Sequence, residues 1–157
     1  MSKRYIFKTN PQKSANLVTI NSFMMGSLFF ILTLIITLDP NKFSKYAIYE
    51  LVLAIPLLYV SSLAYSKIGY SEETPAWDTF GWLTHTTGNS FVLNAVGLVA
   101  SKFNQSLAYV YFAILLFLMI IYTITNIKHR KELWIQKIFK LFFLVVIIIW
   151  GGMLLVQ

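Results

Sequence analysis

Long stretches without a charged residue, separated by short clusters of charge, set the pattern of this chain. Uncharged stretches cover residues 14–38, 79–101 and 103–127. A helix of about 20 apolar residues crosses the roughly 30 Å hydrocarbon core of a bilayer. The pattern therefore predicts an all-α bundle of membrane helices that forms one integral membrane domain over residues 1–157. The five expected spans are 17–38, 46–66, 79–101, 106–127 and 138–156.

The third expected span, 79–101, is the least apolar, because every residue from 84 to 90 is polar or glycine. A four-span alternative, in which this segment does not cross, must therefore be compared. Short cytoplasmic loops carry an excess of Lys and Arg. Five spans with the N-terminus inside place ten of the 13 basic residues inside and three outside, whereas four spans place six inside and seven outside. The charges thus favour five spans, with the N-terminus inside and the C-terminus outside.

The composition is that of a chain surrounded by lipid, and it excludes several classes of site. Charged residues make up 12% of the chain, about half of the roughly 25% found in soluble domains. The chain has no cysteine, so it forms no disulfide, thiolate metal site or cysteine nucleophile. Most of its basic residues are Lys and flank the apolar spans. They favour contact with anionic lipid headgroups on the cytoplasmic side rather than with nucleic acid.

Small residues recur in two of the expected spans. In the third span they stand seven residues apart, at Gly81, Gly88 and Ala95. The first span has a comparable stripe of small and hydroxyl residues: Ser22, Gly26, Thr33 and Thr37. Small side chains let helix backbones approach closely in a membrane. We interpret both stripes as helix-packing surfaces; the alternative is a polar path or small-ligand cavity around residues 84–94.

Three polar residues of the third span are candidates for function: His85, Asn89 and Asn94. His85 is the one histidine inside an expected span, and Asn89 follows it by one helical turn. Ionisable groups inside a bilayer are costly and often functional. His85 can be a hydrogen-bonding core residue, or it can carry protons. With no cysteine and no neighbouring carboxylate it does not complete a metal site, so neither a metal nor a cofactor is expected.

Glu50 is the one acidic residue inside an expected span, and it enters the membrane from the side opposite to His85. A direct pair between the two is therefore not expected. Our first interpretation is an interfacial carboxylate near the lysines of that surface: Lys42, Lys45 and Lys102. The alternative is that Glu50 and His85 mark the two ends of a proton or cation path, lined by Asn89 and Asn94.

Function is constrained mainly by what the sequence lacks. A Gly-x-Ser-x-Gly elbow, a His-Glu-x-x-His metal motif and a phosphate-binding loop are absent, so an enzyme is not expected. The first hypothesis is an accessory, assembly or protective partner of another membrane protein, with self-association as a further option. The alternative is a small oligomeric transporter or channel for protons, cations or a small polar solute that uses the third span. Abundant Lys, Ile and Asn with two Arg are typical of an AT-rich genome, and we expect a bacterial inner membrane.

Overall fold

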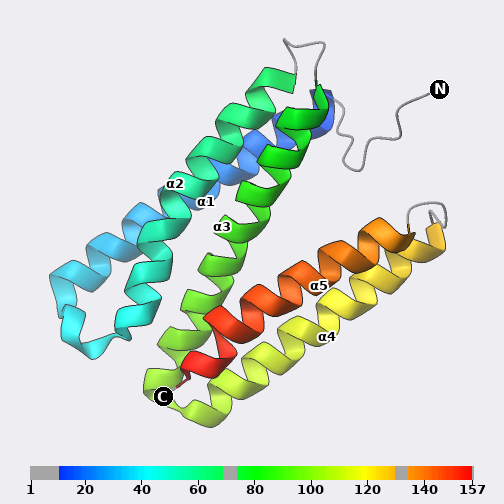
Figure 1. The fold of residues 1–157 in the computed structure, drawn as a ribbon. Coiled ribbons are helices and arrows are strands. Elements are labelled where there is room, and N and C mark those ends of the chain that lie inside the picture. Colours follow the sequence, from blue (N-terminus) through cyan, green and yellow to red (C-terminus); the bar gives the residue numbers. More distant parts are fainter. Residues whose placement is uncertain (1–10, 69–73, 130–133, 157) are drawn as a thin grey trace, which may run out of the picture. The chain divides into compact units, whose positions relative to one another are not determined.

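A computed structural model describes residues 11–68, 74–129 and 134–156, and these residues form helices and no strand. The predicted all-α class is confirmed. In chain order the elements are α1 (Pro11–Leu38), η1 (Pro40–Lys42), α2 (Lys45–Ile68), α3 (Thr74–Phe103), α4 (Gln105–His129), α5 (Trp134–Gly151) and η3 (Met153–Leu155), where η marks a short 3₁₀ helix (Figure 1). Five of the ten basic residues expected on the inside lie outside these ranges: Lys3, Arg4, Lys8, Arg130 and Lys131.

Four of the helices, α1, α2, α4 and α5, are long and apolar enough to cross a membrane. The chain therefore has the helices of an integral membrane protein. The third expected span lies within one unbroken helix of 30 residues, α3, which is about 45 Å long at 1.5 Å per residue. It is long enough to cross but more polar than the other four. The last expected span, 138–156, differs in detail: its α-helix ends at Gly151, and a 3₁₀ turn follows.

The fold divides into two compact units that share α2 and α3. Unit 1 comprises Met1–Pro40 and Leu51–Asn89, and unit 2 comprises Asn41–Glu50 and Ser90–Gln157. Unit 1 thus contains α1, most of α2 and the first half of α3. Unit 2 contains the first turns of α2, the second half of α3, and the α4–α5 hairpin. The single membrane domain expected from the sequence stays a prediction.

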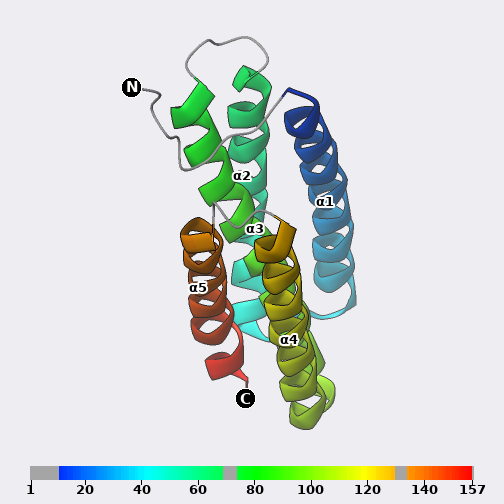
Figure 2. The same ribbon diagram turned by 90° about the vertical axis from the view of Figure 1, so that its right-hand side faces the viewer.

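In unit 1, α1 buries one residue in every seven: Ser14, Asn21, Leu28 and Ile35. A seven-residue repeat keeps one face of a helix against its neighbours. Helices α2 and α3 run antiparallel in this unit (Figure 2), since Gly81 lies against Tyr65 and Gly88 lies against Leu58. These contacts bring the polar first half of α3 onto the inner faces of α1 and α2.

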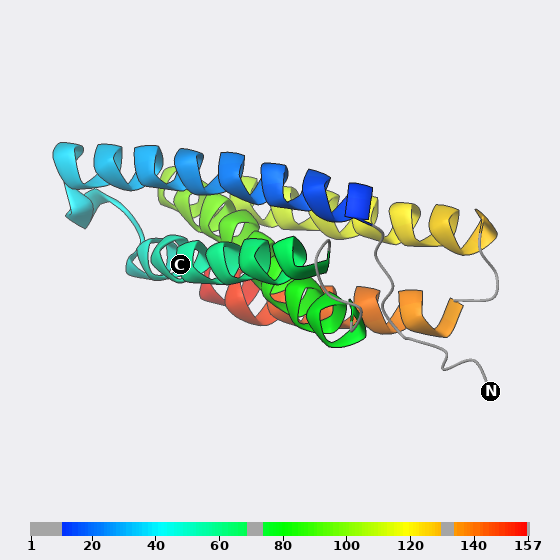
Figure 3. The same ribbon diagram turned by 90° about the horizontal axis from the view of Figure 1, so that it is seen from above.

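In unit 2, α4 and α5 form an antiparallel hairpin (Figure 3). At one end, the Lys137 ammonium donates a hydrogen bond to the Asn126 carbonyl. Near the other end the fully buried Phe112 ring lies against Gly97 and Gly152, and a Cβ atom on Gly152 would stand 2.6 Å from the ring. The ring therefore fills space that side chains at these two glycines would otherwise need.

Candidate functional site

His85 is the centre of a polar cluster in unit 1. Its Nδ1 atom lies 2.7 Å from Oδ1 of Asn21, which joins α3 to α1. The Asn21 amide nitrogen donates to the Leu58 carbonyl at 3.4 Å and to the Ser61 hydroxyl at 3.1 Å. Because a carbonyl can only accept, the amide nitrogen faces Leu58 and the amide oxygen faces His85. Nδ1 of His85 is therefore the donor in its bond to Asn21.

Asn89, one turn further along α3, contacts the same imidazole, and its amide nitrogen lies 3.2 Å from Nδ1 of the ring. Its amide nitrogen donates to the His85 carbonyl at 2.9 Å and lies 3.0 Å from Nε2 of the ring. With Nδ1 donating to Asn21 and Nε2 accepting from Asn89, the network fits a neutral ring with its hydrogen on Nδ1. Tyr65 contacts the ring edge-on, with the centroids 6.2 Å apart. Nδ1 therefore joins α3 to α1, whereas the contact of Nε2 with Asn89 lies within α3.

Ser61 closes this network back onto α3. It accepts from Asn21 and donates its own hydroxyl hydrogen to the Gly81 carbonyl at 3.0 Å. Hydrogen bonds thus run in one direction from α3 through α1 and α2 to α3 again. The sequence pointed to His85 and Asn89 but not to Asn21 or Ser61. The signal for Asn21 is its place in the seven-residue repeat with Leu28.

Unit 2 contains a second polar cluster, formed by Glu50 and Asn94. Both side chains are buried: 7% of Glu50 and none of Asn94 is exposed. The Asn94 amide nitrogen donates to Oε1 of Glu50 at 3.1 Å and to the carbonyl of Ile147 at 3.2 Å. Asn94 thus links the first turns of α2 to the last turn of α5.

Two consecutive glycines make room for this link. A Cβ atom on Gly151 would stand 2.6 Å from the amide nitrogen of Asn94 and 2.8 Å from Oε1 of Glu50. A Cβ atom on Gly152 would stand 2.7 Å from Oδ1 of Asn94. Real side chains do not approach polar atoms so closely. The glycines therefore let both polar side chains reach the backbone at the end of α5.

Two oxygen atoms of this cluster are buried without a hydrogen-bond partner, Oε2 of Glu50 and Oδ1 of Asn94. In the part of the chain that the structure describes, the one hydrogen bond to Glu50 comes from Asn94. The structure differs from our first interpretation of Glu50 in its neighbours, whereas its depth in a membrane stays a prediction. The three lysines expected as its neighbours are exposed and do not pair with it: Lys42, Lys45 and Lys102. The physical reason is the glycine pair, which gives Glu50 a buried partner.

The small residues of α3 and α1 have different surroundings. A Cβ atom on Gly81 would stand 3.1 Å from the Tyr65 ring, and one on Gly88 would stand 3.0 Å from Leu58. Ala95 is 1% exposed. These three positions therefore lie at close contacts. A Cβ atom on Gly26, by contrast, would meet nothing within 4 Å.

The stripe predicted on α1 thus does not pack against other helices of this chain in the described structure, where the buried face carries Asn21 and Leu28 instead. Its four members are exposed: Ser22, Gly26, Thr33 and Thr37. The hydroxyls of Ser22 and Thr33 donate to backbone carbonyls four residues earlier, at 2.9 and 2.8 Å. A hydroxyl satisfied by its own helix can face outward, so its presence does not identify the buried side.

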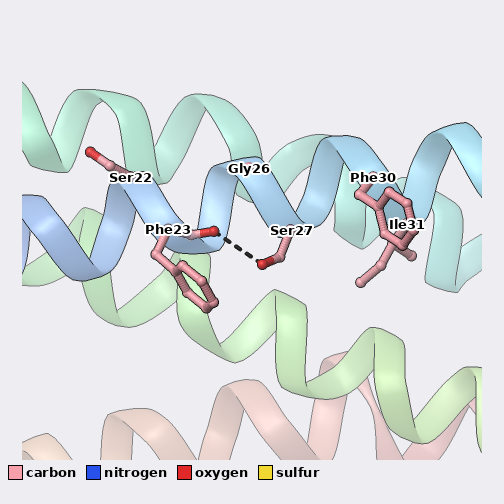
Figure 4. Close-up of a pocket in the computed structure, with 6 residues that line it drawn as sticks. All are labelled: Ser22, Phe23, Gly26, Ser27, Phe30 and Ile31. Carbon is pink, nitrogen blue, oxygen red and sulfur yellow. Dashed lines mark hydrogen bonds between the residues drawn. The ribbon is translucent and has the colours of Figure 1, made fainter.

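A shallow notch lies on this outer face of α1 (Figure 4). Its floor is at Gly26, where no side chain projects. Phe23 and Phe30, which are 77% and 65% exposed, stand on either side of it along the helix. The Ser27 hydroxyl donates to the Phe23 carbonyl at 3.1 Å. The notch therefore has a glycine at its floor, a serine whose hydroxyl is hydrogen-bonded within α1, and an aromatic side chain on either side.

No group of three or more metal-ligating side chains occurs among the described residues. Comparisons with protein-family models, with curated proteins and with solved structures found no match to this chain. The two polar clusters and the notch on α1 are therefore the features from which function is argued.

Proposed function

We propose that this chain is a five-span protein of a bacterial inner membrane, with the N-terminus inside and the C-terminus outside, that acts as a non-enzymatic accessory, assembly or protective partner of another membrane protein. The excess of basic residues on one side supports the orientation. The polar groups of α3 support its crossing, because His85, Asn89 and Asn94 are hydrogen-bonded to other helices or to their own helix. A helix whose polar groups are satisfied within the protein can cross lipid.

The proposed role as a partner rests on the contrast between Gly26 and the other described glycines. A Cβ atom on each of the others would meet a neighbouring side chain within 3.4 Å: Gly81, Gly88, Gly97, Gly151 and Gly152. Gly26 alone among them has no neighbour within 4 Å. In membranes, small residues lie where helices approach closely. A helix of the partner protein, resting in the notch between Phe23 and Phe30, would supply the contact that the chain itself does not.

Site-specific crosslinking in native membranes tests this role. A photoreactive amino acid placed at Phe23 should link the chain to one partner protein of fixed mass. The same crosslink should be lost in Gly26→Leu and retained in Ala113→Leu, which places the same leucine side chain at an exposed position on α4. A crosslink within the chain, or to a second copy of it, would overturn the assignment to a different protein.

The transporter or channel for protons or cations is the second candidate. It is favoured by the two polar clusters along α3, because polar groups inside a membrane bundle often mark ion pathways. Flux of protons or alkali-metal ions in proteoliposomes that contain the purified protein would support it. Flux no higher than that of protein-free vesicles would exclude the transporter or channel.

A further inference from the structure

Glu50 is a buried carboxylate for which the described structure provides no positive partner. Its Oε1 atom accepts one hydrogen bond from the neutral amide of Asn94, and its Oε2 atom accepts none. Burying an ionised carboxylate costs several kcal/mol unless another charge or several hydrogen bonds compensate it. One neutral donor is too little. The hydrogen bond from Asn94 therefore does not compensate the burial of an ionised Glu50.

The surroundings of Glu50 increase this deficit rather than relieve it. Asn94 uses both hydrogens of its amide nitrogen, on Glu50 and on the Ile147 carbonyl. Its own oxygen, Oδ1, is left buried without a partner. The cluster also adjoins the end of α5 at Gly151, where the last carbonyl groups of a helix carry partial negative charge. The two buried atoms without a hydrogen-bond partner at this point, Oε2 of Glu50 and Oδ1 of Asn94, are both oxygen acceptors.

We propose that Glu50 and Asn94 bind a single monovalent cation, a proton or an alkali-metal ion, at the C-terminal end of α5. Such a ligand supplies what the cluster lacks, one positive charge directed at Oε2 of Glu50 and Oδ1 of Asn94. Gly151 and Gly152 keep side chains away from both residues. A divalent cation fits less well, because it prefers several anionic oxygens and this cluster has one carboxylate.

The inference goes beyond the accessory role and does not depend on it. It deepens the second candidate, since a cation carried through the bundle would bind here. Binding and transport remain separable. A cation that binds but does not cross proteoliposomes would retain the site and remove the transporter.

Thermal unfolding of the full chain in detergent tests the site, because a ligand of the folded state raises the melting temperature. The wild type is compared with Glu50→Gln, which is neutral and nearly the same size, over a range of pH. At each pH, sodium, potassium and choline chloride are compared at equal ionic strength. Asp39→Asn, which removes an acid outside α2, is the matched control and should respond like the wild type.

A bound alkali-metal ion and a bound proton give different results in this experiment. An alkali-metal ion should raise the wild-type melting temperature by about 5 °C over choline at saturation. A proton should raise it as the pH falls, with no preference among the salts. The infrared band of a protonated carboxylic acid should then appear in the wild type and in Asp39→Asn. In Glu50→Gln the corresponding shift or band should be lost.

Equal responses of the wild type and Glu50→Gln to pH and to every salt would overturn the proposal. If Glu50→Gln does not fold, Glu50→Asp and the wild type decide the matter. A wild type with no salt preference and no carboxylic acid band at any pH at which it is folded would equally overturn it. A shorter carboxylate that keeps the preference or the band would support it.

Discussion

Oδ1 of Asn21 lies 2.7 Å from Nδ1 of His85, and this hydrogen bond joins two helices whose contact residues are 64 positions apart in the chain. It gives the central histidine a partner that neither its own helix nor its sequence neighbours could provide. The same amide bonds to Ser61, so one side chain of α1 organises three helices.

A double-mutant cycle should detect this link. We expect Asn21→Ala and His85→Ala to be less destabilising together than the sum of their separate effects, with a coupling of about 0.6 kcal/mol and at most about 1.7 kcal/mol, as for other hydrogen bonds between membrane helices. Unfolding in detergent measures it. The matched cycle pairs Asn21→Ala with Asn94→Ala. These two asparagines share no hydrogen-bond partner, so the effects of the two substitutions on the free energy of unfolding should add within about 0.5 kcal/mol. Equal coupling in both cycles would contradict the bond.

His85→Gln separates packing from proton transfer. The side-chain amide of Gln supplies a donor and an acceptor, as the neutral imidazole does, so we expect the melting temperature to stay close to that of the wild type. We also expect the variant to complement a strain that lacks the protein. An amide does not titrate near neutral pH, whereas imidazole does. A stably folded variant that fails to complement would contradict this expectation and would support a proton path through His85.

Gly88→Leu should overpack the contact between α2 and α3. The first added atom would already stand 3.0 Å from Leu58 and 3.2 Å from Leu57. We therefore expect the free energy of unfolding to fall by about 1–3 kcal/mol. Gly26→Leu is the matched control, because a Cβ atom there meets nothing within 4 Å. Its melting temperature in detergent should be unchanged. If the two variants melt alike, Gly88 does not lie at a close contact.

Reporter fusions test whether α3 crosses the membrane. Fusions should report alternating sides, beginning inside and ending outside, when placed after Lys13, Ser44, Glu73, Gln105, Lys131 and Gln157. The physical reason is the bias of basic residues, ten against three, that only five spans produce. Fusions after Glu73 and Gln105 are the decisive pair. If they report the same side, α3 does not cross and the five-span proposal is wrong.

The helices could be predicted from the sequence because long stretches with at most one charged residue mark them. The buried face of α1 could not, since Ser22 and Asn21 are neighbours and both are polar. A hydroxyl can use its one hydrogen on the preceding turn, whereas an Asn side chain has two amide hydrogens and an acceptor oxygen, which one backbone carbonyl cannot all satisfy. That difference favours Asn21 as the buried residue, whereas the stripe predicted from the sequence contains its neighbour Ser22 instead.

Glu50 shows a second limit of reasoning from the sequence. Its position near the start of α2 suggested a surface carboxylate, because depth was counted along a single helix. Its burial depends on Asn94 and on the glycines at the end of α5, which are distant in the chain. No local pattern contains that contact. Two adjacent glycines in an otherwise bulky helix were the one available signal.

The long-range bonds of Asn94 have a consequence for how the protein is made. Bonds that involve Asn21, Ser61 and His85 are available once the chain has been synthesised as far as Asn89. The partner of Asn94 at Ile147 lies 53 residues further on. While the ribosome completes those residues, Asn94 has Glu50 on α2 as a partner but lacks its second partner on α5. Unit 1 can therefore assemble during translation, whereas unit 2 must wait until α5 enters the membrane.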